Sequence, residues 1–256
     1  MNQAEKRLFL IQSLMDELPH DRGLAIPADE AEQKRLLRSL MNVRAPGKIG
    51  AEFLAVQDAY LQAATADKGV TDLASLTPVQ PDIYLWRGDI TTLRCGAIVN
   101  AANSGMTGCY RPCHNCIDNC IHTYAGVQLR LACAELMRAQ GSAEPTGQAK
   151  ITSAYNLPCD YVLHTVGPIV EGRLTRRHEK QLASCYRSCL TLAEENRVES
   201  IAFCCISTGV FMFPNKRAAE LAVRTVKEYK QQTHSKIKVI FNVFQEIDYK
   251  IYSNLL

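Results

Sequence analysis

The chain has 256 residues, of which 47% are apolar and 21% are charged, a composition typical of globular proteins rather than disordered or fibrous ones. Its formal net charge of +3 is too small for a polybasic nucleic-acid binder or a protein of the membrane surface, so we expect a specific ligand and no nucleic-acid or membrane partner. No apolar run approaches the roughly 20 residues of a membrane span, and the amino terminus is unlike a signal peptide. We therefore expect a cytoplasmic protein.

Residues 1–66 carry apolar side chains at intervals of three and four, a spacing typical of helices. The pattern begins at about residue 3 and predicts three helices, the first of which carries Leu8, Ile11 and Met15 on one face. Two interpretations of this helical lobe stay open: it is a packing element for the rest of the chain, or a cap that recognises the substrate. Residues 67–82 are typical of a linker, because proline, glycine and polar residues interrupt the helical pattern.

From residue 83 to residue 256, short apolar runs rich in β-branched residues alternate with stretches of helical periodicity. The predicted strands are residues 83–88, 97–100, 161–166, 200–206 and 238–244. The predicted helices are residues 116–140, 178–197 and 215–232. This alternation predicts an α/β sandwich with a largely buried, mixed sheet. In such sheets ligands bind at the carboxyl ends of the strands.

Small polar residues follow the predicted strands in two places. The first contains Gly88-Asp89-Ile90-Thr91 and, after the next strand, Asn100-Ala-Ala-Asn103-Ser104; the second contains Ser207-Thr208-Gly209-Val210-Phe211. A small-residue turn that leads toward a helix presents consecutive backbone N–H groups, which suit the oxygens of a diphosphate. Ordinary capped turns have the same composition, so this alternative stays open. The glycine patterns of the usual dinucleotide and P-loop folds are absent from the sequence.

Cysteine is over-represented, with eleven residues in all. Four of them, Cys109, Cys113, Cys116 and Cys120, lie close together beside His114. Because a reducing cytosol disfavours disulfides, such a cluster indicates a metal site or reactive thiols. The other seven cysteines lie in strand or helix patterns without a clustered partner, and we expect them to pack in the core.

The three ordered motifs GDIT, VNAANS and ISTGVFMFP resemble those of the macrodomain family of ADP-ribose binders and hydrolases. The resemblance implies a three-layer α/β/α sandwich with a mixed sheet over residues 83–256, preceded by the small helical lobe. It implies that Asp89 binds the adenine amine with Ile90 beside it, and that Asn103 lies at the distal ribose. The residues it assigns to the diphosphate are Ser207, Thr208, Gly209, Val210 and Phe211.

Most macrodomains continue after NAAN with a glycine-rich loop, whereas this chain has GMTGCYRPCHNCIDNCIH. The segment is similar to that of the zinc-dependent macrodomains, a bacterial, sirtuin-linked subgroup of protein ADP-ribosylhydrolases. The resemblance implies one zinc ion per chain, held by Cys109, His114 and Cys116. The residue chemistry agrees, because thiolate and imidazole are favoured zinc ligands and three of them leave the fourth position of a catalytic zinc open. If Cys113 or Cys120 also bound, the site would be closed and structural.

The resemblance implies an enzyme that removes mono-ADP-ribose from modified protein side chains, with ester links to Asp or Glu favoured, and names a lipoyl carrier protein as a partner. Asp118 is the candidate that orients or deprotonates the attacking water, with Asn103 as the second catalytic candidate. Asp118 has a simpler alternative as the cap of a helix that starts near Cys116. Two other functions stay open: a reader module that only binds ADP-ribose, and a redox or structural-zinc protein. We expect His122 and His164 to be structural.

Overall fold

Six strands form one mixed sheet in the computed structural model, which describes residues 1–18 and 25–256. From one edge to the other, the strands are β2 (Ile83–Arg87), β8 (Lys238–Val243), β7 (Ser200–Phe203), β4 (Ala97–Ala102), β6 (Tyr161–Val166) and β5 (Ala149–Ser153). All neighbouring pairs are parallel except β5 and β6, which run antiparallel. The predicted mixed sheet is therefore confirmed.

The five predicted strands all occur; strand 161–166 has the predicted ends, and the other four differ from the prediction by one to three residues at the carboxyl end. The sixth strand, β5, was missed because its sequence AKITS places Lys150 and Ser153 among only three apolar or small residues. This edge strand needs less apolar surface than a central one, since only one of its two edges pairs with another strand. Its presence is what makes an otherwise parallel sheet mixed.

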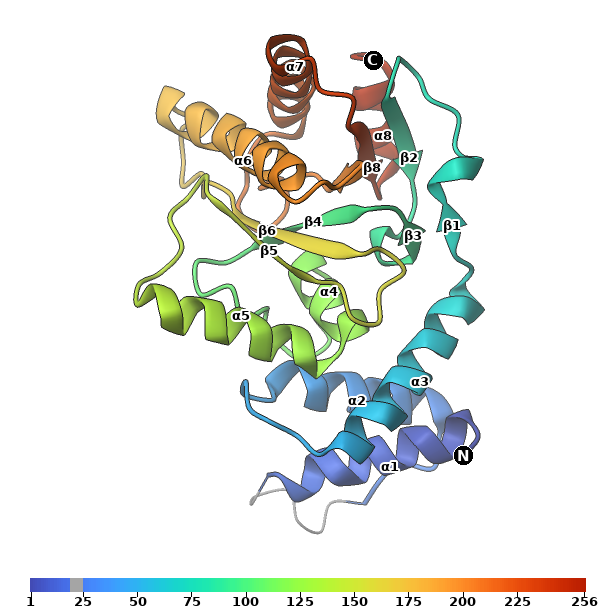
Figure 1. Ribbon diagram of the computed structural model, residues 1–256. Helices are drawn as coiled ribbons and strands as arrows, with labels where there is room; N and C mark the ends of the chain where they lie inside the picture. Colours follow the sequence, from blue (N-terminus) through green and yellow to red (C-terminus); the bar gives the residue numbers. More distant parts are fainter. Residues whose placement is uncertain (19–24) are drawn as a thin grey trace.

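Helices cover both faces of the sheet, which gives the predicted three layers (Figure 1). The layer that contains α4 (Ile117–Ala125) and α5 (Val127–Gln140) packs on β4 and β5. The opposite layer contains α6 (Arg176–Glu195), α7 (Asn215–Thr233) and α8 (Glu246–Ser253), of which α6 packs on β5 and β6 and α8 on β2 and β8. The prediction of one helix over residues 116–140 was wrong, because Gly126 adopts a φ of +96° and ends α4. The last helix, α8, was not predicted.

The amino-terminal helices confirm the predicted helical region. They are α1 (Gln3–Asp16), α2 (Glu30–Val43) and α3 (Ala51–Lys68), and they lie beside the α4 and α5 layer (Figure 1). Their apolar faces bury a hydrophobic cluster of their own, which includes Leu10, Leu37 and Phe53. Val127 of α5 is the residue through which this cluster reaches the sandwich. None of the described helices is long and apolar enough to cross a bilayer.

Residues between the helical region and the sheet also form regular structure. A two-residue strand, β1 (Thr71–Asp72), pairs in parallel with β3 (Leu93–Arg94), and short 3-10 helices cover Leu73–Ser75 and Ile90–Thr92. The segment expected to be a linker is thereby hydrogen-bonded to the loop that follows β2. This pairing brings the carboxyl end of α3 close to that loop.

Polar side chains dock the helical region onto α5. Arg130 is buried, and its Nη1 donates to the carbonyl oxygens of Met41, Asn42 and Arg44 at 3.3, 2.7 and 2.6 Å. These carbonyls belong to the last turn of α2 and the residue after it, where the helix has no N–H donors of its own for its carbonyl oxygens. A guanidinium also carries the positive charge that complements the negative end of the helix dipole.

Replacing Arg130 with Met should lower the free energy of unfolding by about 2–4 kcal/mol, because three carbonyls at the end of α2, two of them in buried hydrogen bonds, lose a charged donor. Urea unfolding followed by circular dichroism would measure the change. Arg138→Met on the same helix is the matched control, since Arg138 is exposed and should cost at most about 1 kcal/mol. Equal losses in the two variants would show that Arg130 does not dock the helical region.

Candidate active site

Three loops meet at one edge of the sheet. Because β2, β4 and β7 are parallel to their neighbours, their carboxyl ends lie at the same edge, and each is followed by one of the predicted ligand-binding segments. Asp89 and Ile90 follow β2, Asn103 follows β4, and residues 207–211 follow β7. The sheet topology therefore gathers the segments that are far apart in the sequence.

The Asp89 carboxylate is fixed from two sides. One oxygen accepts from the backbone N–H and the hydroxyl of Thr91 at 3.0 and 2.6 Å, and the other accepts from the Lys68 ammonium at 3.1 Å. Burial alone raises the pKa of Asp89, but the Thr91 hydrogen bonds and the Lys68 charge together lower it. The carboxylate is thus an ionised acceptor at neutral pH. Ile90 beside it is buried.

The loop of residues 207–211 offers a row of backbone donors. Within the described residues, the N–H groups of Gly209, Val210 and Phe211 have no hydrogen-bond acceptor, while those of Thr208 and Met212 close turns inside the loop. Ser207 adopts a left-handed φ of +65°, and its hydroxyl is buried without a partner. Consecutive N–H groups in such a turn form a concave site for an anion. The Phe211 carbonyl accepts from Val170 N–H at 2.9 Å, which anchors the loop.

Asp118 of α4 lies against the end of β4. One carboxylate oxygen accepts from the Asn100 amide at 2.8 Å, and the other accepts from the Asn103 amide at 3.2 Å. Burial raises the pKa of Asp118 to about 6, although both amides stabilise the charged form. The imidazole of His122 lies 3.6 Å from Asp118, but burial lowers the pKa of His122 well below its usual value, so the ring is neutral. The charged form of Asp118 is therefore stabilised by its two amide donors and by the positive charge of Arg130.

The alternative that Asp118 caps α4 was wrong. The residue at the helix N-cap is Cys116, whose Sγ accepts from the Asn119 backbone N–H at 3.4 Å. The Asp118 side chain lies in the first turn and turns away from the helix end toward β4. Asp118 and Asn103, the two candidate catalytic residues, are thus in direct contact.

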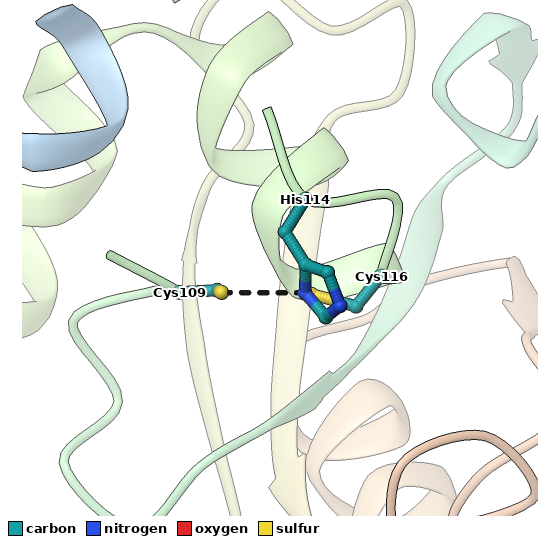
Figure 2. A group of neighbouring side chains, drawn as sticks. All are labelled: Cys109, His114 and Cys116. Carbon is teal, nitrogen blue, oxygen red and sulfur yellow. Dashed lines mark hydrogen bonds between the residues drawn. The ribbon is translucent and has the colours of Figure 1, made fainter. Parts of the chain in front are cut away.

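Cys109, His114 and Cys116 come together although they lie on different parts of the loop that leads to α4. Figure 2 shows Cys109 and His114 pointing toward one another, with Cys116 beside the ring. The Cys109 Sγ and the His114 Nδ1 are 3.5 Å apart, and the ligand atoms of all three residues lie within 4.8 Å of one another. All three side chains are half-buried. Burial raises the pKa of Cys116 to about 12, so a thiolate here needs a cation to stabilise it.

The donor set fits a zinc ion. Zinc–sulfur and zinc–nitrogen bond lengths in a tetrahedral site place such a sulfur and nitrogen about 3.6 Å apart, which agrees with the observed Cys109–His114 separation of 3.5 Å. Two thiol sulfurs and one imidazole nitrogen are ligands that zinc favours. Three protein ligands leave room for a fourth, exchangeable one.

The two rival cysteines point elsewhere. The Cys113 sulfur lies 3.2 Å from the Ser39 hydroxyl and 3.4 Å from the Arg35 carbonyl, both on α2. The Cys120 sulfur accepts from Arg38, also on α2, at 3.6 Å. Neither belongs to a ligand group with Cys109, His114 and Cys116 among the described residues.

A second group of ligand-type side chains lies deeper. His122, Cys133 and His164 are fully buried and have their donor atoms within 4.8 Å of one another. His164 is already satisfied by Asn100 at 3.2 Å and by the Thr152 hydroxyl at 2.9 Å, as expected of a structural histidine. The seven cysteines outside the loop are all free, and each is buried except the half-buried Cys205.

Sequence reasoning missed three residues of this site. Asn100 stands inside the VNAANS motif, and a polar residue at the end of an apolar strand was the signal that could have indicated its role. The other two residues come from the helical region. Lys68 precedes its partner Asp89 by 21 residues, and Arg38 precedes its partner His114 by 76 residues. No local pattern connects either residue to its partner, so only the folded chain identifies them.

Comparison with known proteins adds to this geometry. A Macro domain family model matches residues 99–222. The chain is 61% identical to a Protein-ADP-ribose hydrolase of Treponema medium, with 100% of both chains covered. It is 49% identical to a Protein-ADP-ribose hydrolase of Staphylococcus aureus, over 95% of this chain and 92% of that one. A solved Trypanosoma brucei macrodomain in complex with ADP-ribose is similar with a TM-score of 0.66 and 31% identity, over 85% of this chain and 94% of that one.

Gly108 is a point at which the loop tolerates no side chain. Its φ is +85°, and a Cβ there would lie 2.7 Å from the Cγ of His122. Gly108→Ala should therefore lower the free energy of unfolding by more than about 2 kcal/mol. Gly141→Ala is the control, because Gly141 has a similar φ of +74° with open space around it, and should cost only about 1 kcal/mol. Denaturant unfolding that gave equal values for the two variants would contradict this packing argument.

Proposed function

This chain belongs to the macrodomain family, and we propose that it is a zinc-dependent protein-ADP-ribose hydrolase of the sirtuin-linked type, which removes mono-ADP-ribose from modified protein side chains and releases ADP-ribose. The observation that carries the proposal is the meeting of Cys109, His114 and Cys116 on the loop between β4 and α4, close enough to Asp118 that its charge adds to burial in raising the pKa of Cys116. Two of the relatives reported above carry the name Protein-ADP-ribose hydrolase.

The binding half of the site suits ADP-ribose. The free N–H groups of Gly209, Val210 and Phe211 donate to the diphosphate oxygens, and Ser207 and Thr208 of the same turn line this subsite. The ionised Asp89 carboxylate accepts from the adenine amine, and the apolar Ile90 side chain packs beside the base. Binding energy from these remote groups holds the distal ribose in place for reaction.

The catalytic half rests on Asp118 and Asn103. Asn100 and Asn103 fix both oxygens of the Asp118 carboxylate, so its orientation is set before the substrate binds. Asp118 orients the attacking water and accepts its proton, which its raised pKa favours. Asn103 hydrogen-bonds the distal ribose. Hydrolysis consumes this water and yields free ADP-ribose and the unmodified protein.

Cys109, His114 and Cys116 hold one zinc ion in this proposal. A zinc with an open position supplies Lewis acidity toward the ribose oxygens or lowers the pKa of a bound water toward ~7. Because Cys113 and Cys120 point toward α2 and not toward the other three residues, the site has three protein ligands rather than four, which supports a catalytic rather than a structural role.

Three finer points complete the proposal. The bond cleaved is an ester to Asp or Glu, and a lipoyl carrier protein is a substrate, as the resemblance to the zinc-dependent subgroup implies. The protein acts in the cytoplasm, which its eleven free cysteines support because free thiols persist in reducing compartments. Residues 1–66 are a helical lobe that docks on the macrodomain of residues 83–256 and is joined to it by residues 67–82.

The zinc requirement is tested by metal analysis and chelation. We expect one zinc per chain, loss of hydrolysis of a mono-ADP-ribosylated protein after chelation, and recovery when zinc is restored. ADP-ribose binding, measured by calorimetry, should survive chelation because the diphosphate and adenine groups do not depend on the metal. Binding without any hydrolysis would instead identify a reader module. Full activity in metal-free protein would refute the zinc requirement.

Asp118→Ala should abolish turnover, by at least about 100-fold, while ADP-ribose binds with near-normal affinity. The reason is that Asp118 acts on the water and not on the diphosphate or adenine. Single-turnover hydrolysis and calorimetry separate the two effects. Retention of the full hydrolytic rate would remove Asp118 from the catalytic role.

Gly209→Glu should impair ADP-ribose binding, whereas Asp118→Ala should impair only turnover. A Cβ at Gly209 meets no atom within 4 Å, so the fold should be unaffected, but a carboxylate at the diphosphate subsite should weaken ADP-ribose binding by more than about 10-fold. Gly209→Gln is the matched control for size without charge and should bind more tightly than Gly209→Glu. Normal binding by Gly209→Glu would exclude this loop as the diphosphate site.

A further inference from the structure

Helix α2 of the helical lobe makes direct contact with the loop of residues 109–116. The Nη2 of Arg38 donates to the His114 carbonyl at 2.8 Å and to the Asn119 side-chain oxygen at 3.0 Å. Arg38 forms no ion pair with a carboxylate among the described residues. Its charge is instead directed at the backbone of a residue that belongs to the Cys/His group.

Asn119 links Arg38 to the beginning of the loop through its side-chain amide. It is fully buried, and its amide nitrogen donates to the carbonyls of Cys109 and Arg111 at 3.3 and 3.0 Å. With its oxygen on Arg38 and its nitrogen on these carbonyls, the Asn119 amide has one favourable orientation. Arg38 and Asn119 together therefore hold the peptides of Cys109 and His114, whose side chains face each other at 3.5 Å.

Asn42, one helical turn after Arg38, holds the middle of the loop. Its side-chain oxygen accepts from the Cys113 backbone N–H at 2.9 Å, and its nitrogen donates to the Thr123 hydroxyl at 2.9 Å. Cys113 has a left-handed φ of +51°, which is unfavourable for a residue with a side chain. A contact from outside the loop is thus what keeps the turn before His114 in this conformation.

We infer that Arg38 and Asn42 are positioning residues that hold the Cys109–His114–Cys116 group in its metal-binding arrangement, so that the helical lobe sets the affinity of the site for zinc. The inference rests on the proposed function in that zinc is the metal. It gives the helical lobe a role distinct from core packing. Outer residues that orient metal ligands typically change metal affinity by about 10-fold to 100-fold when they are removed.

The test compares Arg38→Met with Arg35→Met in the full-length protein. Arg35 lies on the same helix, is exposed, and hydrogen-bonds to the loop only through its backbone carbonyl, so its variant loses the same charge without losing a side-chain hydrogen bond to the loop. Zinc dissociation constants are measured by competition with a chromophoric chelator. We expect about 10-fold to 100-fold weaker binding for Arg38→Met, an intermediate value for Arg38→Lys, and no change for Arg35→Met.

Hydrogen exchange in the zinc-free protein tests the positioning role without a metal. Amide hydrogen exchange of residues 109–116 in zinc-free protein should be faster in Arg38→Met than in Arg35→Met, while exchange in β4 and β6 stays the same. If Arg38→Met fails to fold, Asn42→Ala is used in both assays, with the same expected direction.

The outcomes separate the two proposals. A wild-type protein that does not bind zinc overturns the proposed metal function, and the exchange experiment then decides by itself whether α2 holds the loop. A wild type that binds zinc, with Arg38→Met and Asn42→Ala indistinguishable from Arg35→Met in both affinity and exchange, overturns the positioning role.

Discussion

The interaction on which the site depends is the hydrogen bond between the Asn100 amide and the buried Asp118 carboxylate. Asn100 lies within the central strand β4, and Asp118 lies in the first turn of α4, so this bond joins the sheet to the helix whose N-cap is Cys116. A carboxylate removed from water is costly unless donors surround it. Asn100 and Asn103 supply these donors, and in doing so they fix the position of α4 relative to the strand end. Because the loop of residues 109–116 leads into α4, the contacts of Asn100 and Asn103 with Asp118 also position this loop.

The helical region docks on the sandwich through polar contacts as much as through apolar ones. Arg130 of α5 reaches the end of α2, while Arg38 and Asn42 of α2 reach the Cys/His loop, and Lys68 at the end of α3 reaches Asp89. Directional bonds of this kind specify one docking geometry more strictly than apolar burial, which is non-directional. The helical region thereby contacts both the loop that carries the metal-ligand candidates and the candidate adenine subsite.

Much of the fold could be predicted from local pattern. The apolar runs that became β4, β6, β7 and β8 are buried on both faces of the sheet, so they stand out in the sequence as near-continuous β-branched segments. Strand β5 could not be recognised from the sequence, because AKITS has no continuous apolar run. It is a strand because it pairs with β6. The break at Gly126 was missed for a similar reason, since a glycine inside an apolar periodic stretch is compatible with a continuous helix until its φ is known.

The sequence by itself determined the kinds of chemistry present: two thiols and an imidazole at short spacing, a carboxylate two residues beyond them, and small-residue loops after strands. These are properties of residue type and local order. Only the tertiary structure decided which cysteine sulfurs converge with His114 and which turn toward α2, because the direction of a side chain in an irregular loop depends on contacts that lie outside the loop. It likewise decided that Lys68, Arg38 and Asn42 belong beside the site. Their partners are distant in sequence, and no local propensity encodes a contact formed by packing one unit against another.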